Sequence, residues 1–333
     1  MRTQNVGTVV AIVVNWNGCS LLEDCLTALT KQNYLLHEII LVDNGSTDSS
    51  VAFVRQRFPN VRIIELSENK GFAGGSVAGL RACSGEFVAL LNNDTWAEAS
   101  WLETLMHPMV EKSEIGICAS RLVFAGSASI ESAGQSLTTC GVGINRGVGR
   151  PLSEFGSSSL VFGACGAAAL YRREMLDEIG FLDEDFFLYD EDTDLNFRAQ
   201  LAGWKCVYVP DAVVYHRANA TAGRLSDTHV YYHTRNLEFV WVKNMPLGLM
   251  IRFAHHKVIQ EVGAFVYLCL RHMKWRPFFR AKRDAFRMMP AMWRKRAEIQ
   301  KRRRVSNRYI REILASVLSL ELIGQKARQL LWG

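Results

Sequence analysis

Acidic side chains gather in one short segment of this 333-residue sequence, YDEDTDLNFRAQLAGW (189–204). Four carboxylates fall within five positions there: Asp190, Glu191, Asp192 and Asp194. A helix beginning at this point explains part of the cluster, because acids are favoured in a first helical turn and Asp194 can pair with Arg198 one turn later. Repulsion among four carboxylates needs further compensation, and a carboxylate beside a cleft is a candidate general base.

A second polar segment, LLNNDT (90–95), follows an apolar run and delivers Asn92, Asn93 and Asp94 to the end of a predicted strand. Such oxygen ligands suit Mg²⁺ or Mn²⁺ bridging two phosphates, an ion that needs few protein ligands. His216, in DAVVYHR directly after a predicted strand, could complete a Mn²⁺ shell. An acidic turn and a structural histidine are the alternatives for these residues.

Two other strand ends also carry polar residues, in NWN (15–17) and DNGSTD (43–48). An aspartate at a strand tip, here Asp43, can accept hydrogen bonds from the amide edge of a nucleobase. The residues that follow it are typical of a turn with helix-capping hydroxyls. A simple strand-to-helix cap is therefore the alternative for this segment.

Glycines cluster in ENKGFAGGSVAG (68–79). Gly71, Gly74 and Gly75 permit close approach of the backbone to a ligand. The segment matches neither GxGxxG nor GxxxxGK[ST] and does not follow the first strand, so a dinucleotide site or a P-loop is poorly supported. We expect this segment to face a phosphate or a sugar.

The elements that must position these residues alternate regularly. Apolar, β-branched runs and helical spacing predict strands over 8–14, 38–44, 61–66 and 86–92 and helices over 20–33, 47–58 and near 73–84. This alternation indicates an α/β fold with a doubly wound, mostly parallel sheet. Such sheets bind ligands at the carboxyl ends of their strands, where the polar segments fall.

Composition excludes several classes of protein. Apolar residues make up 49% and charged residues 22%, so neither a disordered nor a fibrous chain is expected. The eight cysteines form no CxxC pair, which disfavours a zinc finger or a disulfide scaffold and favours reduced thiols in a cytoplasm. The first apolar stretch lacks a signal-peptide cleavage site, and no window reaches the ~20 apolar residues of a membrane span. We expect a soluble or peripheral protein.

Charge is distributed unevenly along the chain. Residues 271–311 contain 16 Lys and Arg against two acids, so the remainder is acidic although the net charge is +6. Aromatic residues lie among these cations, a pattern typical of an interfacial helix on anionic lipid. A solvated helical appendage is one alternative and a nucleic acid, which we disfavour, is another. With Pro246 as a boundary, we predict a catalytic domain over 1–245 and a basic amphipathic helical extension over 246–333.

Together these segments resemble family 2 inverting glycosyltransferases of the GT-A fold, in particular the rhamnosyltransferase-like branch acting on bacterial cell-surface polysaccharides. The resemblance covers about residues 6–245. It is carried by VVNWNG (13–18), ILVDNGSTDSS (40–50), ENKGFAGGSVAGL (68–80), LLNNDT (90–95), GACGAAALYRRE (163–174), FFLYDEDTDLNFRAQLAGW (186–204) and YYHTRN (231–236).

The resemblance implies roles for individual residues. Asp192 would be the catalytic base, with Glu191 beside it shaping the acceptor site. Asp94 would ligate Mn²⁺ or Mg²⁺, and His216 would join the metal shell. Asp43 would contact the nucleoside base. The rest of the donor site would comprise Asn15, Asn17, Asn44, Gly71, Phe72, Gly74, Gly75, Asn92 and Asn93. The triplet reads Asn-Asn-Asp where the family has Asp-x-Asp, which leaves Asp94 as its only carboxylate.

The implied activity is metal-dependent transfer of a sugar onto a polyprenyl-diphosphate-linked glycan at the inner face of the cell membrane. L-Rhamnose from dTDP-rhamnose is the first choice of donor, and UDP-galactofuranose, UDP-N-acetylhexosamines and UDP-glucose stay open. A non-catalytic sugar-nucleotide-binding scaffold is an alternative that the intact acidic cluster disfavours. A nucleotidyltransferase would carry a Gly-rich, Lys/Arg-bearing loop directly after the first strand, which WNGCSLLEDC lacks.

Overall fold

The computed structural model describes residues 7–217 and 225–316. Its strands are β1 (Val9–Asn15), β2 (Glu38–Asp43), β3 (Arg62–Glu65), β4 (Phe87–Asn92), β5 (Thr95–Ala97), β6 (Ile115–Phe124), β7 (Ile130–Ala133), β8 (Gln135–Leu137), β9 (Gly143–Asn145), β10 (Ser159–Val161), β11 (Ala168–Arg172) and β12 (Lys205–His216). Its α-helices are α1 (Cys19–Thr30), α2 (Ser50–Arg57), α3 (Gly71–Ala82), α4 (Trp101–Glu111), α5 (Arg173–Ile179), α6 (Glu191–Ala202), α7 (Asp227–Asn244), α8 (Leu247–Phe265), α9 (Trp275–Lys301) and α10 (Asn307–Ile313). A π-helical turn, Val266–Arg271, follows α8.

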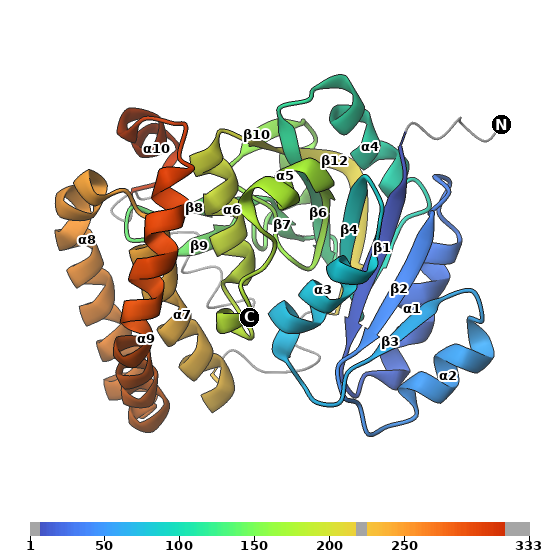
Figure 1. Cartoon of the computed structure of the whole chain (residues 1–333), viewed down its shortest axis with the longest axis horizontal. Coiled ribbons are helices and arrows are strands. Elements are labelled where there is room, and N and C mark those ends of the chain that lie inside the picture. The colour runs from blue at the N-terminus through green and yellow to red at the C-terminus, as the bar shows by residue number, and fades with distance from the viewer. Residues whose placement is uncertain (1–6, 218–224, 317–333) are drawn as a thin grey trace.

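Ten strands form one sheet, most of them in the order β10-β12-β6-β11-β4-β1-β2-β3. The predicted alternation is confirmed, since β4, β1, β2 and β3 run parallel with helices between them. β11 enters antiparallel between β4 and β6. The fold is therefore the predicted mostly parallel α/β sheet, seen nearly edge-on in Figure 1.

Helices cover both faces of the sheet, and alternate side chains of β1 pack in the hydrophobic cores on the two faces. Val9 and Val13 pack with Leu26 of α1 and Trp101 of α4 on one face. Val10 and Ile12 pack with residues of α3, α5 and α6 on the other face. Burial on both sides explains why β1 is a continuous apolar run and not an alternating one.

One long-range pairing brings two predicted metal ligands together. His216 was expected to follow a strand, but it is the last residue of β12. The short strand β5 pairs antiparallel with this end of β12, with Thr95 opposite His216. This register places His216 next to Asp94. No local pattern predicts this contact, because the two residues are 122 positions apart in the chain.

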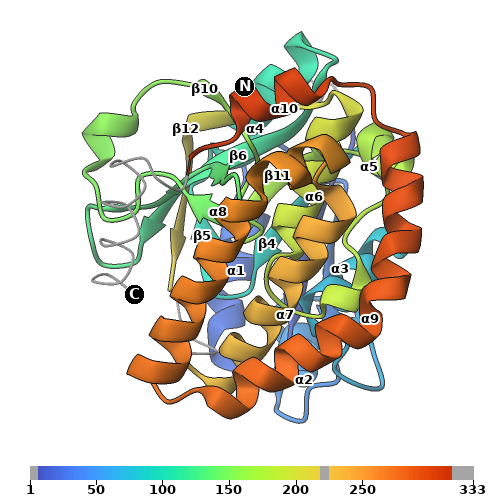
Figure 2. The same ribbon diagram turned by 90° about the vertical axis from the view of Figure 1, so that its left-hand side faces the viewer.

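The C-terminal helices form a third layer on the far side of α6. Figure 2 shows α8 and α9 crossing the face that lies at the left in Figure 1, with α7 between them. Phe197 of α6, Phe239 of α7 and Met292 of α9 share one hydrophobic core. The extension is helical as predicted, although residues 317–333 lie outside the described part. The helices after Pro246 share one hydrophobic core with side chains of α6 and α7. A domain boundary at Pro246 stays a prediction.

Among the described residues, no helix combines the length and the hydropathy that crossing a lipid bilayer requires.

Candidate active site

A hydrogen-bonded row of polar side chains runs along the carboxyl ends of three neighbouring strands. The Nδ2 atom of Asn93 donates to Oδ1 of Asn15 at 2.8 Å. Asn15 in turn places its Nδ2 atom 3.4 Å from Oδ1 of Asp43. Asn15 and Asp43 are buried, so the row is fixed by its own contacts at the edge where such sheets bind ligands.

The DNGSTD turn folds back over the end of β1. Asp43 accepts a hydrogen bond of 3.0 Å from the backbone N–H of Ser46, and Asn17 accepts one of 2.8 Å from that of Thr47. Asn17 itself has a left-handed backbone, with φ of 50°. The two turns therefore brace each other, and the contact of Asp43 with a nucleobase stays a prediction.

Asn44 ties this turn to the glycine-rich segment. Its Nδ2 atom donates to the carbonyl oxygen of Gly71 at 2.9 Å, and its Oδ1 atom accepts from the N–H of Lys70 at 2.9 Å. The glycines that follow belong to α3 and not to a loop. A Cβ atom on Gly75 would lie 2.6 Å from a methyl group of Val14, so this glycine lets the helix lie close to the sheet.

The other residues of this segment contact protein as well. Phe72 packs against the core on the α3 side of the sheet, and a Cβ atom on Gly74 would meet the side chain of Lys70. Asn92 differs, because its Oδ1 atom is buried and has no hydrogen-bond partner within the described structure. Donor contacts of Phe72, Gly74, Gly75 and Asn92 stay predictions.

Asp94 and His216 face each other at the end of β12. Nε2 of His216 lies 3.1 Å from Oδ1 of Asp94, while its Nδ1 atom lies 2.8 and 2.9 Å from the two carboxylate oxygens of Glu131 on β7. Burial by itself lowers the pKa of His216, but Glu131 and Asp94 outweigh burial and raise that pKa to about 10. Glu131 was not singled out from the sequence, since it lies in a Gly- and Ser-rich stretch without a motif.

These residues suit a divalent cation shared with a ligand, provided that the cation replaces the proton between Nε2 of His216 and Asp94. A carboxylate that fixes the far nitrogen of an imidazole is the usual outer partner of a metal-binding histidine. Across the described residues, no group of three or more His, Cys, Asp or Glu side chains is arranged to hold a metal ion. Asp94 and His216 would thus supply two ligands, and diphosphate oxygens and water would supply the others, as is common for Mg²⁺.

Asp192 lies in the first turn of α6, and its carboxylate accepts four hydrogen bonds, one of them from the hydroxyl group of Thr193 at 3.3 Å. Its Oδ2 atom accepts from the N–H of Gly166 and from Nε2 of Gln135, both at 2.9 Å, and Oδ1 accepts from the N–H of Thr193 at 2.6 Å. Burial nevertheless raises the pKa of Asp192 above its ordinary value. A carboxylate with a raised pKa that is held in one orientation is suited to accept a proton.

Glu191 is the more deeply buried of the pair. Its Oε2 atom has no hydrogen-bond partner within the described structure. Burial, followed by the charge of Asp192, raises the pKa of Glu191 well above the ordinary value. Glu191 therefore keeps its proton to higher pH than an ordinary glutamate, and two adjacent carboxyl groups with different surroundings can take different roles.

The other two acids of the cluster have partners within the protein. Asp194 pairs with Arg198 at 2.8 Å and with Lys243 at 2.8 Å, and all three side chains are buried. Asp190 lies 2.8 Å from Nδ1 of His233 on α7. The structural reading of the cluster thus holds for Asp194, while Glu191 and Asp192 are left without a cation among these contacts.

A strained backbone segment leads into α6. Three residues without the freedom of glycine have φ between 63° and 69°: Phe187, Tyr189 and Asp190. Each such residue costs of order 1–3 kcal/mol and persists only where the surroundings impose it. Asn236 imposes it here, because its Nδ2 atom donates at 2.7–3.0 Å to the carbonyl oxygens of Phe186, Leu188 and Tyr189. Asn236 belongs to the string YYHTRN, to which the sequence assigned no role.

The strained segment also contacts the glycine-rich helix. The N–H of Ala73 donates to the carbonyl oxygen of Phe187 at 3.2 Å. A Cβ atom on Gly71 would lie only 2.1 Å from that same oxygen, and Gly71 has a φ of 70°. Asn44, Gly71 and Phe187 therefore form a continuous path from the end of β2 to the start of α6.

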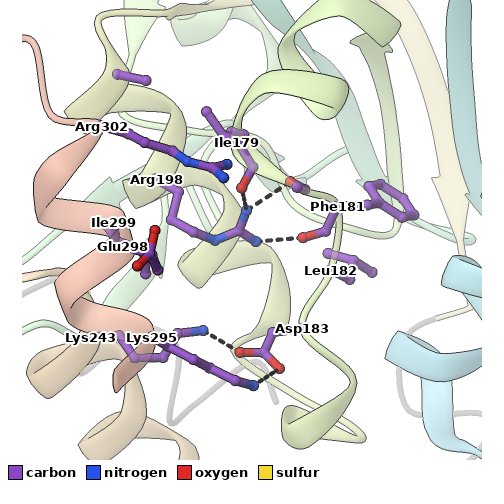
Figure 3. A pocket seen from close by; sticks show the side chains of 12 residues that line it. Ile179, Phe181, Leu182, Asp183, Arg198, Lys243, Lys295, Glu298, Ile299 and Arg302 are labelled. Atoms are coloured by element: carbon purple, nitrogen blue, oxygen red, sulfur yellow. Dashed lines mark hydrogen bonds and ion pairs between the residues drawn. The ribbon is translucent and has the colours of Figure 1, made fainter. Parts of the chain in front are cut away.

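A cavity of about 310 Å³ lies elsewhere, between the α5–α6 connection, α6 and α9 (Figure 3). Arg198 donates there to the carbonyl oxygens of Ile179, Gly180 and Phe181. Lys243 and Lys295 each lie 2.5 Å from Asp183. None of the predicted site residues lines this cavity, and its ion pairs join α7 and α9 to the α5–α6 connection.

The fold and the site define a class of protein. A mostly parallel α/β sheet with helices on both faces and a C-terminal helical layer is the fold predicted above for a GT-A glycosyltransferase. The family model described as Glycosyl transferase family 2 matches residues 10–180, about half of the chain. The chain belongs to this family, and it is a glycosyltransferase.

Curated relatives place it near one branch of the family. The chain is 28% identical over 239 residues to the N-acetylglucosaminyl-diphospho-decaprenol L-rhamnosyltransferase of Mycobacterium tuberculosis, covering 65% of this chain and 78% of that protein. It is 21% identical over 274 residues to the poly-beta-1,6-N-acetyl-D-glucosamine synthase of Staphylococcus epidermidis, covering 80% and 65%. The predicted resemblance to rhamnosyltransferases of family 2 is confirmed.

Solved structures agree on the fold. The mannosyltransferase PcManGT from Pyrobaculum calidifontis, in complex with GDP-Man and Mn²⁺, gives a TM-score of 0.53 at 17% identity, covering 97% of this chain and 87% of that one. GalNAc-T7 with UDP, GalNAc and Mn²⁺ gives a TM-score of 0.57 at 16% identity over 71% of this chain. This chain spans about half, 48%, of that GalNAc-T7 chain.

Proposed function

We propose that this chain transfers L-rhamnose from dTDP-L-rhamnose to a polyprenyl-diphosphate-linked glycan, with inversion at the anomeric carbon. The sugar and the acceptor are suggested by the mycobacterial relative, whose name specifies an L-rhamnosyl group and an N-acetylglucosaminyl-diphospho-decaprenol acceptor. The observation that carries the chemistry is Asp192, a partly buried carboxylate at the start of α6 with a raised pKa and a fixed orientation.

In this account Asp192 removes the proton of an acceptor hydroxyl group. The oxygen attacks the anomeric carbon of the donor while the bond to the nucleoside diphosphate breaks on the opposite face. A single displacement of this kind inverts the anomeric configuration. Glu191, whose pKa is raised by burial and by the charge of Asp192, lies beside Asp192 on the acceptor side. General-base assistance of this type is typically worth 10²–10⁴-fold in rate.

The residues at the strand ends hold the donor. Asp43 and Asn15, which contact each other, bind the nucleoside. Asn44 holds the start of α3 beside the end of β2 through its hydrogen bond to Gly71. Asp94 and His216 would hold Mn²⁺ or Mg²⁺ on the diphosphate, and both solved relatives named above carry Mn²⁺. When bound, the cation supplies neutralisation of the charge that develops on the leaving group.

The acceptor sets the place of action. A polyprenyl-diphosphate-linked glycan is anchored in a bilayer, so the enzyme works at the inner face of the cell membrane as a peripheral protein. The basic segment 271–311 supports this location, because cations near an anionic leaflet each contribute about 1 kcal/mol.

The experiment is donor turnover by the purified chain with Mn²⁺ or Mg²⁺ and a panel of dTDP- and UDP-sugars. Release of nucleoside diphosphate is followed first without an acceptor and then with an N-acetylglucosaminyl-diphospho-polyprenol. We expect release from dTDP-rhamnose, abolished by EDTA and by the substitution Asp94→Ala. Release from a UDP-sugar alone would overturn the rhamnosyl assignment, and tight nucleotide binding without any turnover would favour a scaffold.

A further inference from the structure

An apolar stripe runs along the outer side of α8 and of the π-helical turn after it. Its members recur at helical spacing: Leu247, Ile251, Val258, Ile259, Val262, Val266, Leu270 and Met273. About half or more of each side chain is exposed, reaching 71% for Ile251 and 70% for Met273. Contiguous apolar surface of this kind marks an interaction site.

The opposite side of α8 is anchored, so the stripe cannot turn inward. Phe253 and His256 are buried, and Nδ1 of His256 lies 2.7 Å from Oγ1 of Thr139. Lys257 pairs with Glu238 of α7 at 3.3 Å and with Glu261 at 2.8 Å. These polar contacts fix which side of the helix faces outward, and in the described structure that side is exposed.

The helix α9 adds aromatic residues and cations. Phe279, Phe286 and Trp293 are exposed at seven-residue intervals and thus share one side of α9. Exposed arginines flank them: Arg276, Arg280, Arg283, Arg287 and Arg294. Figure 2 shows α8 and the first half of α9 on the same face of the molecule. We call the stripe together with the exposed residues of the first half of α9 the α8–α9 face; these residues are Phe279, Phe286, Arg276, Arg280, Arg283 and Arg287.

Charge on the α8–α9 face has one sign. Residues 247–297 contain only two acids, Glu261 and Asp284. Glu261 pairs with Lys257 and with Lys282 of α9, and Asp284 lies 2.9 Å from Arg283 and 3.6 Å from Arg287. Two copies docked through this face would bring their arginines together, whereas anionic lipid headgroups would neutralise them. Charge complementarity therefore favours a bilayer over a second copy.

The position of the face relative to the site is fixed by two contacts. Nζ of Lys274, just before α9, lies 2.7 Å from Asp227 at the start of α7. His233, two turns into α7, contacts Asp190 at the entry to α6. The turn between α8 and α9 therefore lies at the same end of the molecule as the acidic segment that contains Asp192.

We propose that the α8–α9 face docks on an anionic lipid bilayer, with the α8 stripe in the boundary between headgroups and acyl chains and the arginines of α9 among the headgroups. The main apolar contact thus comes from residues 247–273, which lie mostly before the basic segment 271–311. The proposal deepens the proposed function and rests on its lipid-linked acceptor, because docking in this way brings the active-site end of the molecule to the membrane.

Vesicle co-sedimentation of the full chain, without sugar nucleotide or acceptor, tests this docking. The probes are phosphatidylcholine vesicles with and without phosphatidylglycerol. We expect the wild-type chain to sediment with the anionic vesicles, and Val262→Glu to weaken this binding at least about tenfold, because a carboxylate would enter the apolar boundary. Val110→Glu is the matched control, a half-exposed valine of α4 outside this face, and it should bind like the wild type.

A second pair of variants tests the cationic part. Arg276→Gln and Arg287→Gln should each weaken binding to anionic vesicles about fivefold at low salt and leave the weak binding to phosphatidylcholine unchanged. Thermal melting and slow donor hydrolysis of all variants should match the wild type, which excludes misfolding as the cause.

Three results would overturn the proposal: no sedimentation with anionic vesicles, equal binding by Val262→Glu and the wild type, or a wild-type dimer by light scattering that Val262→Glu converts to a monomer. The vesicle assay involves no sugar transfer, so failure of the docking and failure of the proposed activity are distinguishable.

Discussion

The side chain of Asn236 donates a hydrogen bond of 2.7 Å to the carbonyl oxygen of Tyr189, 47 positions earlier in the chain. Asn236 is wholly buried, and it holds the left-handed backbone that leads to Asp192. The conformation in front of the proposed base is therefore set by a helix outside the sheet, and Asn236 is a positioning residue.

Asn236→Ala should lower kcat about 10- to 100-fold and leave the KM for the donor within about twofold, because the substitution moves Asp192 and not the strand ends. The measurement is steady-state kinetics with nucleotide affinity determined separately. Asn244→Ala is the matched control, since Asn244 is a buried asparagine of α7 that contacts Asp194 and not the strained segment. An equal loss of kcat in both variants would show that Asn236 has a structural role only and does not position Asp192.

Gln135 should set the pH dependence of the reaction. Its Nε2 atom donates to Asp192 and stabilises the ionised form, opposing the effect of burial on the pKa of Asp192. Gln135→Leu removes that donor, so the pKa of Asp192 should rise and the acid limb of kcat/KM should move to higher pH. Gln200→Leu, a buried glutamine of α6 that donates to Phe162, should leave the limb in place. If the acid limb of kcat/KM stays at the same pH or moves to lower pH in Gln135→Leu, the assignment of Asp192 as the base is wrong.

Asp194 should matter for stability and not for chemistry. Asp194→Asn leaves the buried cations of Arg198 and Lys243 without their carboxylate, so we expect a loss of about 3–5 kcal/mol in the free energy of unfolding at neutral pH. Urea denaturation measures this loss, while kcat per folded molecule should be retained.

The pH dependence of that loss has a definite sign. Burial raises the pKa of Asp194, but Lys243 and Arg198 outweigh burial and lower it. Its contribution is present above the pKa of an unfolded aspartate, ~3.8, and fades as the pH falls through the lower folded-state pKa. The difference between Asp194→Asn and the wild type should therefore shrink below about pH 4. Asp177→Asn, which removes an exposed partner of Arg173, should cost less than about 1 kcal/mol throughout.

Gly71→Ala tests the path from the strand ends to α6. The new Cβ atom would overlap the carbonyl oxygen of Phe187, and the left-handed backbone adds about 1–2 kcal/mol of strain. Gly126→Ala has the same backbone strain, with φ of 75°, but open space around the new atom. We expect lower thermal stability in both variants and a loss of kcat in Gly71→Ala alone. Full activity in Gly71→Ala would show that the contacts from Asn44 through Gly71 to Phe187 do not position the start of α6 for catalysis.

Local patterns were sufficient to predict the parallel sheet. Val9–Val13 and Ile39–Val42 are uninterrupted apolar runs because helices cover both faces of these strands. Such a run therefore predicts a strand that is buried on both faces. The start of α6 was also predictable from a local pattern, because acidic residues in a first helical turn are favoured by the helix dipole.

Long-range pairing was not predictable. Glu131 comes next to His216 only because β7 and β12 both pair with β6, and Gln135 reaches Asp192 across 57 positions. Neither residue belongs to a motif. The glycines of α3 show a different limit, because close packing on Val14 and close approach to a ligand both select glycine at Gly75.

The most direct test of the central claim is single-turnover transfer by Asp192→Asn. With saturating dTDP-rhamnose, Mn²⁺ and an N-acetylglucosaminyl-diphospho-polyprenol acceptor, the wild type should form an inverted glycoside. Asp192→Asn should bind the donor with unchanged affinity and form the product about 10²- to 10⁴-fold more slowly, because the amide cannot accept the acceptor proton. Transfer by Asp192→Asn at the wild-type rate, or a product with retained configuration, would contradict the account.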